Sequence, residues 1–386
     1  MQAAASGILA AIKPQRSESS RSSAVRLETR SAYAQARTLC LSLCIVPSMA
    51  VNMKDIARDL GVSVVTISKA LRNHPDISQR MRERVLLKVK ELGYRPNLTA
   101  RSLVTGRSSL IGLIVPDLIH PFFAEVAKGL SLAMRQHGYF LVLASSEEDP
   151  ELEQQEIDHM LAHRLDAMVI ASCQTDPEFL RKIQLGDTPL FLVDRSFKGF
   201  ASHFVGSDDY AAGKLAAEHL LAIGCKRPAH IRGPENSVGI RRLKGFQETL
   251  KKHGVRLPPE NILCVPKADV AGRVSGVDAM RRLKELRSVP DGVFCYNDVI
   301  AVGVIKEAQK QGIRIPADMT VIGCGNLHYD DEISVPLTSI DQRSSEMGSR
   351  TAKLILEVLT GETPRDYRNV VLQPRLVARA STTGSR

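Results

Sequence analysis

The side chains best suited to a chemical role project from a short helix that is expected to begin just after Ser63. Its buried positions are predicted to be Ile67, Ala70 and Leu71. The side chains left pointing outward are small or basic: Val64, Val65, Thr66, Ser68, Lys69 and Arg72. Such a surface fits the major groove of DNA, where methyl groups meet thymine and a lysine donates to guanine.

A helix-turn-helix would position that surface. Ile56, Ala57 and Leu60 recur at helical spacing, and Gly61 is expected to end their helix. Ser63 is placed to cap the next helix. The turn between the two helices is a few residues long and contains glycine, as this motif requires.

A third helix is expected between Ser78, its cap, and Gly93, with Pro96 preventing continuation. Its apolar stripe consists of Met81, Val85, Val89 and Leu92. Basic side chains occupy its other faces: Arg80, Arg82, Arg84, Lys88 and Lys90. These charges fit either a solvated helix face or attraction to backbone phosphates.

Positive charge is concentrated at one end of the chain, whose formal net charge is +10. Residues 1–107 contain 18 Lys and Arg against 7 Asp and Glu, whereas the remainder contains 34 against 35. A neutral body joined to a basic end is typical of a protein that binds a polyanion. A membrane partner is not expected, because the basic end has no amphipathic helix with an aromatic face.

Two motifs here resemble the signature of the LacI/GalR family of transcriptional regulators. The first is Lys54-Asp55-Ile56-Ala57 followed by Gly61-Val62-Ser63-x-x-Thr66-Ile67-Ser68-Lys69. The second is Leu92-Gly93-Tyr94-Arg95-Pro96-Asn97-x-x-Ala100-Arg101-x-Leu103. The similarity continues through residues 111–117, Asn297-Asp298 and residues 375–382, and covers about residues 51–386. It is specific, because several unrelated motifs occur in the right order.

The resemblance implies roles in DNA recognition. Val64, Val65 and Lys69 fall where the family reads base edges, and Thr66 and Ser68 fall where it touches phosphates. Lys69 replaces the arginine more common there and lacks its planar fork. For the two valines, simple packing is the alternative.

Residues 97–103 match the family's hinge helix, which pairs with its copy in the minor groove. Leu103 matches the leucine that wedges into a central base step, at a cost of roughly a few kcal/mol that wider contact can offset. Ala100 is small enough to approach the groove floor closely. The alternative is an ordinary interdomain linker.

The body alternates short apolar runs with segments of helical period. Runs of strand length span residues 110–115, 140–144, 167–171, 190–193, 293–295 and 321–323. Helical periodicity is found in segments such as 122–136, 151–162, 210–222, 240–253 and 301–311. This alternation predicts parallel sheets covered by helices, and the body is long enough for two lobes.

The resemblance implies a periplasmic-binding-protein-like body, with crossovers between lobes near residues 206–209, 334–340 and 370–373. Ligands of such folds lie in the cleft at the carboxyl ends of the strands. The predicted fold class is therefore a small all-α DNA-binding head plus an α/β two-lobed body. Its predicted divisions are a tail or misassigned start at 1–50, a helix-turn-helix domain at 51–96, a hinge helix or linker at 97–108, and an effector-binding and dimerisation domain at 109–386.

Five residues are candidates for effector contacts: Phe122, Phe123, Asp194, Arg242 and Asn297. The two phenylalanines follow the first strand and could stack on a sugar or base, the alternative being hydrophobic core. Asp194 and Arg195 end another strand, where they form either a cleft contact or a local ion pair.

Arg242 and Asn297 are candidates because of the resemblance. Arg242 matches a family arginine that binds effector, and its alternative is a surface charge. Asn297 is expected to cap a helix, and the family often uses this position to contact effector. The two roles of Asn297 can coexist.

One position departs from the family. An aspartate usually follows the strand equivalent to residues 321–323 and often binds ligand hydroxyls, but Gly325 occupies that place here. A glycine has no side-chain acceptor, so a standard sugar effector is in doubt. Either Asn326 compensates, or the ligand is different or absent.

Catalytic and metal-binding motifs are not found. The sequence lacks a Gly-x-Ser-x-Gly elbow, a His-Glu-x-x-His pair and a Walker loop. Neither enzymatic activity nor a cofactor or metal is therefore expected. The acids at 330–332 are expected to lie in a solvated loop. The seven cysteines are scattered, which favours reduced thiols and a cytoplasmic location.

The first 50 residues are rich in Ser, Ala and Arg and contain two acids, Glu18 and Glu28. That composition resembles a transit peptide. The apolar stretch at 41–46 is too short to span a membrane. We expect either that Met49 or Met53 is the natural start, or that this segment is a disordered tail.

The sequence as a whole predicts a bacterial, homodimeric DNA-binding regulator, a repressor in preference to an activator. Its expected partners are a pseudo-palindromic double-stranded operator and a small-molecule effector, a sugar or related metabolite. An exported solute-binding protein shares the two-lobed body, but the basic head argues against it. A nucleotide- or sugar-modifying enzyme on an α/β scaffold is disfavoured by the missing catalytic residues.

Overall fold

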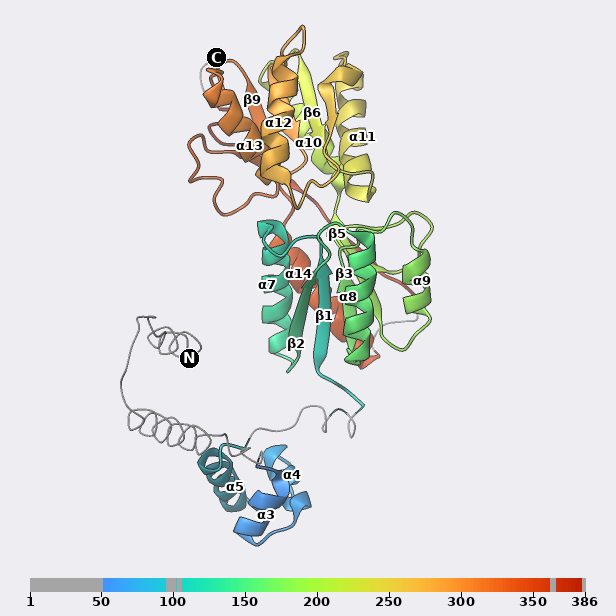
Figure 1. Cartoon of the computed structure of the whole chain (residues 1–386), viewed down its shortest axis with the longest axis vertical. Coiled ribbons are helices and arrows are strands. Elements are labelled where there is room, and N and C mark those ends of the chain that lie inside the picture. The colour runs from blue at the N-terminus through green and yellow to red at the C-terminus, as the bar shows by residue number, and fades with distance from the viewer. Residues whose placement is uncertain (1–50, 95–101, 103–105, 362–365, 384–386) are drawn as a thin grey trace, which may run out of the picture. The chain divides into compact units, whose positions relative to one another are not determined.

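The computed structural model describes residues 51–94, 102, 106–361 and 366–383. The chain divides after residue 97 into two compact units, here called the head and the body (Figure 1). Each unit is described by itself. The segment 1–50, about which the sequence offered two expectations, lies outside the described residues.

The head consists of three helices, α3 (Met53–Leu60), α4 (Val64–Leu71) and α5 (Gln79–Glu91). The side chain of Asn52 caps α3 by accepting from two backbone N–H groups, and that of Asp55 accepts in return from the N–H of Asn52 at 3.0 Å. Gly61 ends α3 in the left-handed conformation, with φ of 65°.

The predicted caps of the head are confirmed, and so are the predicted core positions Ile67 and Ala70, whereas Leu71 is only half-buried. Ser63 Oγ accepts from the N–H of Thr66 at 3.0 Å, and Ser78 Oγ accepts from the N–H of Met81 at 3.4 Å. The fully buried side chains come from all three helices: Ile56, Ala57, Ile67, Ala70 and Val85. These contacts fix which face of α4 remains outside.

The first lobe of the body is a six-stranded parallel sheet in the order β11-β5-β4-β3-β1-β2. Its strands are β1 (Leu110–Val115), β2 (Phe140–Ser145), β3 (Ala167–Ile170), β4 (Leu190–Val193), β5 (His203–Ser207) and β11 (Asn369–Leu372). Its helices are α7 (Pro121–Arg135), α8 (Pro150–Ala162), α9 (Glu178–Gln184) and α14 (Ser344–Thr360). One hydrophobic cluster includes residues of α7 and α14, and a second includes residues of α8 and α9. Helices therefore cover both faces of the sheet.

The second lobe repeats this plan with the order β12-β10-β9-β8-β6-β7. Its strands are β6 (Pro228–Arg232), β7 (Ile262–Cys264), β8 (Gly292–Cys295), β9 (Thr320–Cys324), β10 (Thr338–Asp341) and β12 (Arg375–Val377). Its helices are α10 (Asp209–Ala222), α11 (Ser237–Lys252), α12 (Gly272–Lys284), α13 (Asp298–Lys310) and a 3-10 turn at Pro259–Asn261. Strand β12 pairs with β10 in the antiparallel sense, an exception at the edge of the sheet.

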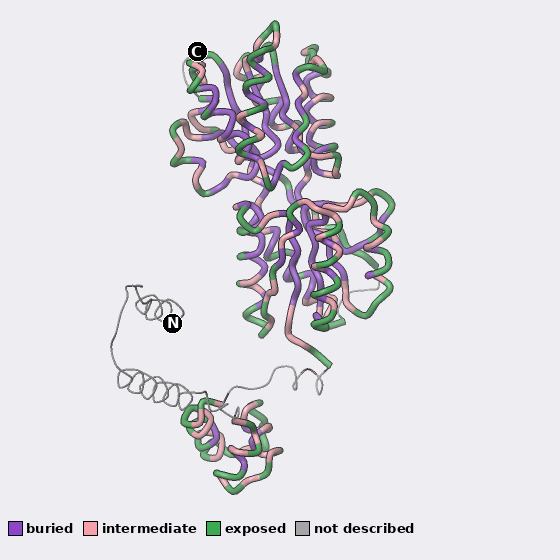
Figure 2. Tube along the Cα trace, in the orientation of Figure 1, coloured by how far each residue is buried: buried purple, intermediate pink, exposed green. Residues whose placement is uncertain are grey.

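Buried residues follow the strands of both lobes (Figure 2). The predicted two-lobed α/β class is confirmed, and every predicted strand corresponds to an observed one. Strands such as β5 were not indicated by the sequence. The residues of β5 mix polar and apolar side chains, so they form no continuous apolar run.

The chain passes between the lobes three times, after β5, after β10 and after β11. The expected crossover at 334–340 is placed too early, because residues 338–341 are still a strand of the second sheet. Residues 342 and 343 make that crossing instead. The other two expected ranges, 206–209 and 370–373, include the last residues of the preceding strand.

Helices α10 and α11 pack at a distance that only glycine permits. A Cβ added to Gly213 would lie 2.0 Å from the carbonyl oxygen of Arg242, and one added to Gly245 would lie 2.0 Å from that of Tyr210. This close approach brings the beginning of α10 against the side chain of Arg242.

Candidate functional site

The two valines at the start of α4 differ in how far they are exposed. Val65 is 63% exposed. Val64 is half-buried and packs against the hydrophobic core of the head. Of the two, only Val65 therefore presents most of its methyl surface outside the head.

The polar side chains of α4 are held by their neighbours. Lys69 Nζ contacts Asp76 Oδ2 at 2.7 Å, and this contact lowers the pKa of Asp76. Arg72 Nη2 donates to Ser68 Oγ at 2.8 Å, and Thr66 Oγ1 lies 2.9 Å from Ser63 Oγ. Lys69 would have to leave the carboxylate of Asp76 before it could donate to a base edge.

The basic residues of α5 fall into two groups. Arg82 is half-buried and donates to the carbonyl oxygens of His74 and Ile77, while Lys88 pairs with Asp59 at 3.5 Å and Glu91 at 3.1 Å. These two therefore hold the head together. The other three basic side chains are exposed: Arg80, Arg84 and Lys90. Ala100 and Leu103, expected in the minor groove, lie outside the described residues.

In the body, an arginine and an aspartate join the two lobes. Arg195, just after β4 of the first lobe, donates to the carboxylate of Asp269 in the second lobe, and both side chains are buried. Arg195 Nη2 also lies 3.4 Å from Glu148 Oε1, and Glu148 Oε2 accepts from the N–H of Asp269 at 3.3 Å. Burial and the nearby charge of Asp269 raise the pKa of Glu148 to about 7.

Asn297 links the same aspartate to the start of α13. Its Oδ1 accepts from the N–H of Ile300 at 2.9 Å, which is the predicted helix cap. Its Nδ2 donates to Asp269 Oδ1 at 3.1 Å and lies 3.3 Å from Nε2 of His120, in the first lobe. The cap and a position in the cleft therefore coexist in Asn297.

Arg242 is buried, which excludes the alternative of a surface charge. Its Nε donates to Asp209 Oδ1 at 3.0 Å, and its guanidinium lies 4.8 Å from the ring centroid of Tyr296. It also donates to the carbonyl oxygen of Tyr296. Burial raises the pKa of Asp209, and the ion pair with Arg242 opposes that rise.

Asp194 differs from these paired carboxylates. It is buried, adopts a left-handed φ of 64°, and its one ion pair within the described residues is with Arg195 Nε at 3.9 Å. Burial raises the pKa of Asp194 to about 7, and the carboxylate of Asp209 adds to the rise. Asp194 is therefore a buried, weakly paired carboxylate at the end of β4. Its strained backbone conformation is of the kind that clusters at binding sites.

Phe122 and Phe123 belong to the hydrophobic core of the first lobe. They are 5% and 2% exposed, and their rings meet edge to face at 5.1 Å. The structure therefore places both rings in the core, which the sequence analysis gave as the alternative to stacking on a ligand.

Two cavities lie between the lobes. One of about 230 Å³ is lined by Asp194, Ser196, Phe197, Phe200, Ser202, Phe204, Ser207, Asp209, Ser237, Arg241, Asn369 and Val371. The other, of about 410 Å³, is lined by residues 117, 119–121, 269–274, 299 and 329. The first contains buried carboxylates, and the second contains Asp269 beside mainly apolar side chains.

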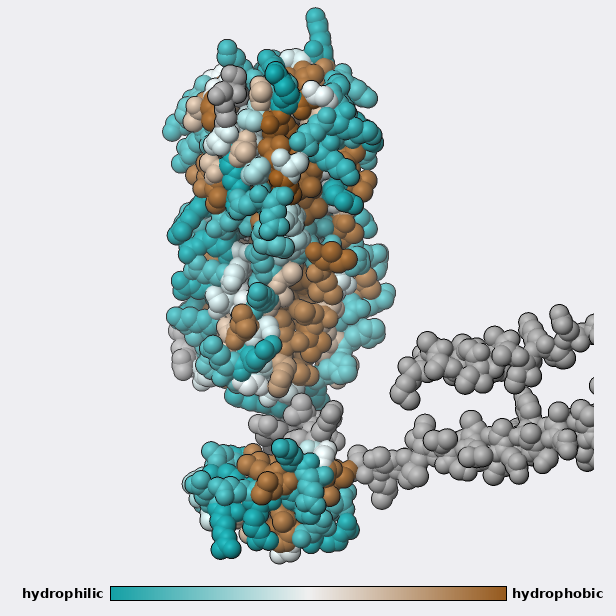
Figure 3. Space-filling model, turned by 90° about the vertical axis from the view of Figure 1, so that its left-hand side faces the viewer, coloured by the Kyte–Doolittle hydropathy of each residue, from teal (hydrophilic) through white to brown (hydrophobic). Residues whose placement is uncertain are grey.

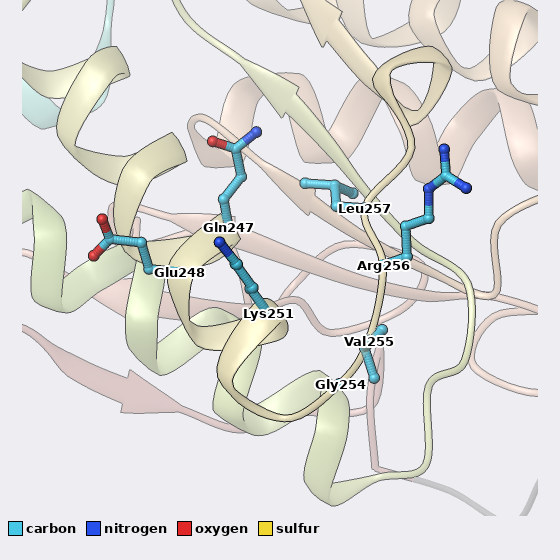
Figure 4. Close-up of a pocket in the computed structure, with 7 residues that line it drawn as sticks. All are labelled: Gln247, Glu248, Lys251, Gly254, Val255, Arg256 and Leu257. Carbon is cyan, nitrogen blue, oxygen red and sulfur yellow. The ribbon is translucent and has the colours of Figure 1, made fainter.

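A further hollow of about 570 Å³ lies away from the cleft, between α11 and the segment that follows it (Figure 4). Gln247, Glu248 and Lys251 project from the helix, and Arg256 and Leu257 lie opposite. The charged side chains here are exposed, so this hollow lacks the buried polar groups that fix a ligand's orientation.

The surroundings of Gly325 explain its departure from the family pattern. Its φ is 144°, and an added Cβ would lie 2.7 Å from Asp298 Oδ2. The carboxylate of Asp298 thus fills the space into which a side chain would project. Asn326 does not replace the missing acceptor, because its Oδ1 accepts from Arg379 at 2.8 Å.

Asp298 has a second carboxylate beside it. The expectation of a solvated loop at 330–332 is wrong for Asp330, which is fully buried, while Asp331 pairs with Arg379. Burial and the charge of Asp298 raise the pKa of Asp330 to about 9. The two acids share the N–H of Leu327. No group of metal-binding side chains occurs in the part of the chain that the structure describes.

One face of the first lobe carries exposed hydrophobic side chains around α7 and the edge strand β2 (Figure 3). Its members are Leu118, Ile119, Leu132, Phe140 and Leu143. Ile119 is 87% exposed and Phe140 is 56% exposed. Large exposed apolar side chains that gather on one face indicate an interaction site.

Several cleft residues with buried polar side chains were not expected from the sequence: His120, Glu148, Asp209, Asp269 and Tyr296. Asp209 could have been found, because it lies two residues after strand β5, in a position similar to that of Asp194 directly after β4. Asp269 lies in a segment without regular structure, so periodicity gave no signal for it.

The chain matches two protein families. Residues 52–97 match the bacterial regulatory proteins of the lacI family, and residues 217–382 match a periplasmic binding protein-like domain. The ribose operon repressor of Halalkalibacterium halodurans is 30% identical over 336 residues, covering 86% of this chain and 97% of the relative. The transcriptional repressor CytR of Escherichia coli K12 is 30% identical over 314 residues, covering 81% and 91%.

Solved structures agree with this fold. A complex of the transcriptional regulator CelR with cellobiose has a TM-score of 0.65 at 26% identity, covering 86% of this chain and 99% of its own. The lac repressor dimer bound to operator and the anti-inducer ONPF has a TM-score of 0.75 at 24% identity, with the same coverage. In the described part of the chain, no helix is long and apolar enough to cross a membrane.

Proposed function

The chain belongs to the lacI family of bacterial regulatory proteins, and from this premise we propose that it is a transcriptional repressor whose operator affinity is set by a small-molecule effector. It acts as a homodimer, and each head reads one half of a pseudo-palindromic operator. It works in the bacterial cytoplasm and is not an enzyme. The observation that carries the proposal is the capped α4 with its exposed Val65 and basic end.

In this proposal, the outward face of α4 contacts the base edges. Val65 supplies a methyl surface for thymine, and Lys69 donates to guanine once it leaves Asp76. Thr66, Ser68 and Arg72 contact phosphates, together with the exposed cations of α5. Val64 contributes by packing, because its side chain belongs to the core of the head. Ala100 and Leu103 occupy the minor groove in this proposal.

The effector binds between the lobes. Asp194, Arg242 and Asn297 all lie where the carboxyl ends of the strands of both lobes meet. A ligand there interacts differently with open and closed lobes, so its binding shifts the balance between them. Phe122 and Phe123 support this site from the core beneath it.

The apolar face around α7 and β2 forms the dimer contact. It contains an edge strand and large exposed side chains, which would invite unspecific association if they were left uncovered. Two-fold symmetry would bring the same patch of both subunits together.

Duplex binding tests the proposal. The full chain is used to select its site from randomised double-stranded DNA, and the affinity is then measured by fluorescence anisotropy over a range of salt concentrations. We expect a two-fold symmetric site and a steep loss of affinity as salt rises. Lys69→Ala should relax the sequence preference, whereas Lys251→Ala, on the body surface, should leave it unchanged. Selection of no site at low salt would refute the proposal.

A further inference from the structure

The cavity of about 230 Å³ between the lobes is lined by two buried polar groups that the protein satisfies poorly. Among the described residues, no hydrogen bond reaches the carboxylate of Asp194, and Ser207 Oγ is buried with no hydrogen-bond partner. Both residues line the cavity and are about 5% exposed. Buried polar groups are normally satisfied, so these two indicate the place of a ligand.

The charges around the cavity do not balance. The lining contains two acids, Asp194 and Asp209, and one arginine, Arg241. The ion pairs that adjoin them add the acids Glu148, Asp208 and Asp269 and the arginines Arg195 and Arg242. Arg195 pairs with Asp269 and Glu148, Arg242 pairs with Asp209, and Arg241 pairs with Asp208 at 3.1 Å. Five acids thus face three arginines, and Asp194 has the most distant of these contacts, 3.9 Å from Arg195 Nε. Since a weakly paired buried carboxylate is costly, a bound positive charge would be stabilised beside it.

The rest of the lining is both aromatic and hydroxylic. Three phenylalanines and four serines belong to it: Phe197, Phe200, Phe204, Ser196, Ser202, Ser207 and Ser237. Aromatic faces attract cations, and serine hydroxyls both donate to and accept from ligand hydroxyls. The volume lies below the roughly 300 Å³ at which pockets for drug-sized ligands begin, so the ligand is small.

We propose that this cavity binds a small hydroxylated primary amine, with its ammonium group on the carboxylate of Asp194 and its hydroxyls on Ser207 and the neighbouring serines. The inference rests on the proposed effector-gated function and names the chemical class of the effector. It also accounts for Gly325, because a ligand held by Asp194 does not need the aspartate that the family places there. Arg241, the basic residue of the lining, is exposed and paired with Asp208, so it does not neutralise Asp194.

Matched pairs of amine and alcohol test this assignment on the full chain. Isothermal titration calorimetry measures D-glucosamine against D-glucose, and 2-amino-1,3-propanediol against glycerol. Each pair exchanges an ammonium for a hydroxyl at nearly constant shape. We expect at least one amine to bind ten-fold or more tightly than its alcohol. If no amine exceeds its alcohol, or if an alcohol binds more tightly, the cavity is not a cation site and the assignment is overturned.

A variant locates the binding. Asp194→Asn should reduce the affinity for the preferred amine at least ten-fold, whereas Asp318→Asn, on an exposed ion pair, should leave it unchanged. Unchanged amine binding by Asp194→Asn would refute the role of this carboxylate. The wild-type comparison of amine with alcohol needs no variant and stands even if Asp194→Asn fails to fold. Operator binding is measured separately, so a chain that binds the amine but no duplex would refute the proposed function and leave this inference intact.

Discussion

Arg195 and Asp269 form a buried ion pair that connects the two lobes of the body. The arginine follows strand β4 of the first lobe, and the aspartate precedes α12 of the second. Glu148 and Asn297 contact the same pair, so the cleft is closed by a network that belongs to the protein itself. The contact between the lobes and the proposed ligand binding therefore involve neighbouring charges of the cleft.

The first prediction concerns this pair. Asp269→Asn leaves Arg195 without its main counterion, and we expect it to lower the free energy of unfolding by about 3–5 kcal/mol, as for other broken buried pairs. Urea denaturation of the full chain measures the loss. The control is Asp318→Asn, whose partner Arg314 is exposed, and which should lower the free energy of unfolding far less. Equal effects of the two substitutions would show that the interlobe pair has no special role.

The two valines of α4 should respond differently. Val65→Ala removes exposed methyl groups, so we expect stability to change by less than about 0.5 kcal/mol while operator affinity falls. Val64→Ala removes packing from the core of the head and should lower its melting temperature. Thermal unfolding and anisotropy with the selected operator distinguish these effects. A stable Val65→Ala variant with full affinity would remove Val65 from the base-reading surface.

A buried histidine gives the second lobe a dependence on pH. His230 stacks on Phe294 at 4.7 Å, and burial lowers its pKa to about 4 from 6.5. Between these values the unfolded chain binds a proton that the folded chain does not, so stability falls as pH falls from 6.5 to 4. The loss reaches about 3 kcal/mol.

Substitution isolates the contribution of this histidine. His230→Phe should flatten the decline of unfolding free energy between pH 6.5 and 4, because the residue no longer takes up a proton in the unfolded state. The exposed His137→Phe serves as the control and should retain the slope of the parent chain. Identical slopes in the two variants would mean that other groups cause the acid destabilisation.

We predict that the backbone conformation and the surroundings of position 325 require glycine. Gly325→Ala adds a Cβ at 2.7 Å from Asp298 Oδ2 at a φ of 144°, whereas Gly254→Ala adds one at a φ of 73° with no atom within 4 Å. Both variants bear the cost of a positive φ, about 1–2 kcal/mol. Only Gly325→Ala also displaces a buried carboxylate, so its unfolding free energy should fall further. Comparable losses would show that the contact with Asp298 is not what requires glycine at position 325.

The apolar face of the first lobe should control the oligomeric state. Phe140→Lys places a charge in the proposed dimer contact, and we expect the dimer dissociation constant to rise at least ten-fold in analytical ultracentrifugation. Leu185→Lys is the matched control, because Leu185 is 89% exposed and lies outside that face. A dimer of Phe140→Lys as tight as the parent would move the contact to another surface.

The sequence by itself determined the helices of the head, their caps and the class of the body. These depend on local chemistry, because Ser63 and Ser78 cap the residues that follow them and Gly61 adopts a conformation that few other residues tolerate. The continuous apolar runs of the central strands likewise report burial on both faces without reference to the partner strands.

Only the tertiary structure decided which polar groups meet in the cleft. Arg195 and Asp269 are 74 positions apart, and neither the spacing nor the identity of either residue indicates the other. Phe122 and Phe123 turned into the core for a related reason, since helix α7 rotates its apolar side toward the sheet as a whole. Asn297 was the exception: its role as a cap is local, and only its contact with Asp269 required the fold. Local hydrogen bonds are specified by neighbouring residues, whereas long-range charge pairs depend on how the two sheets come together.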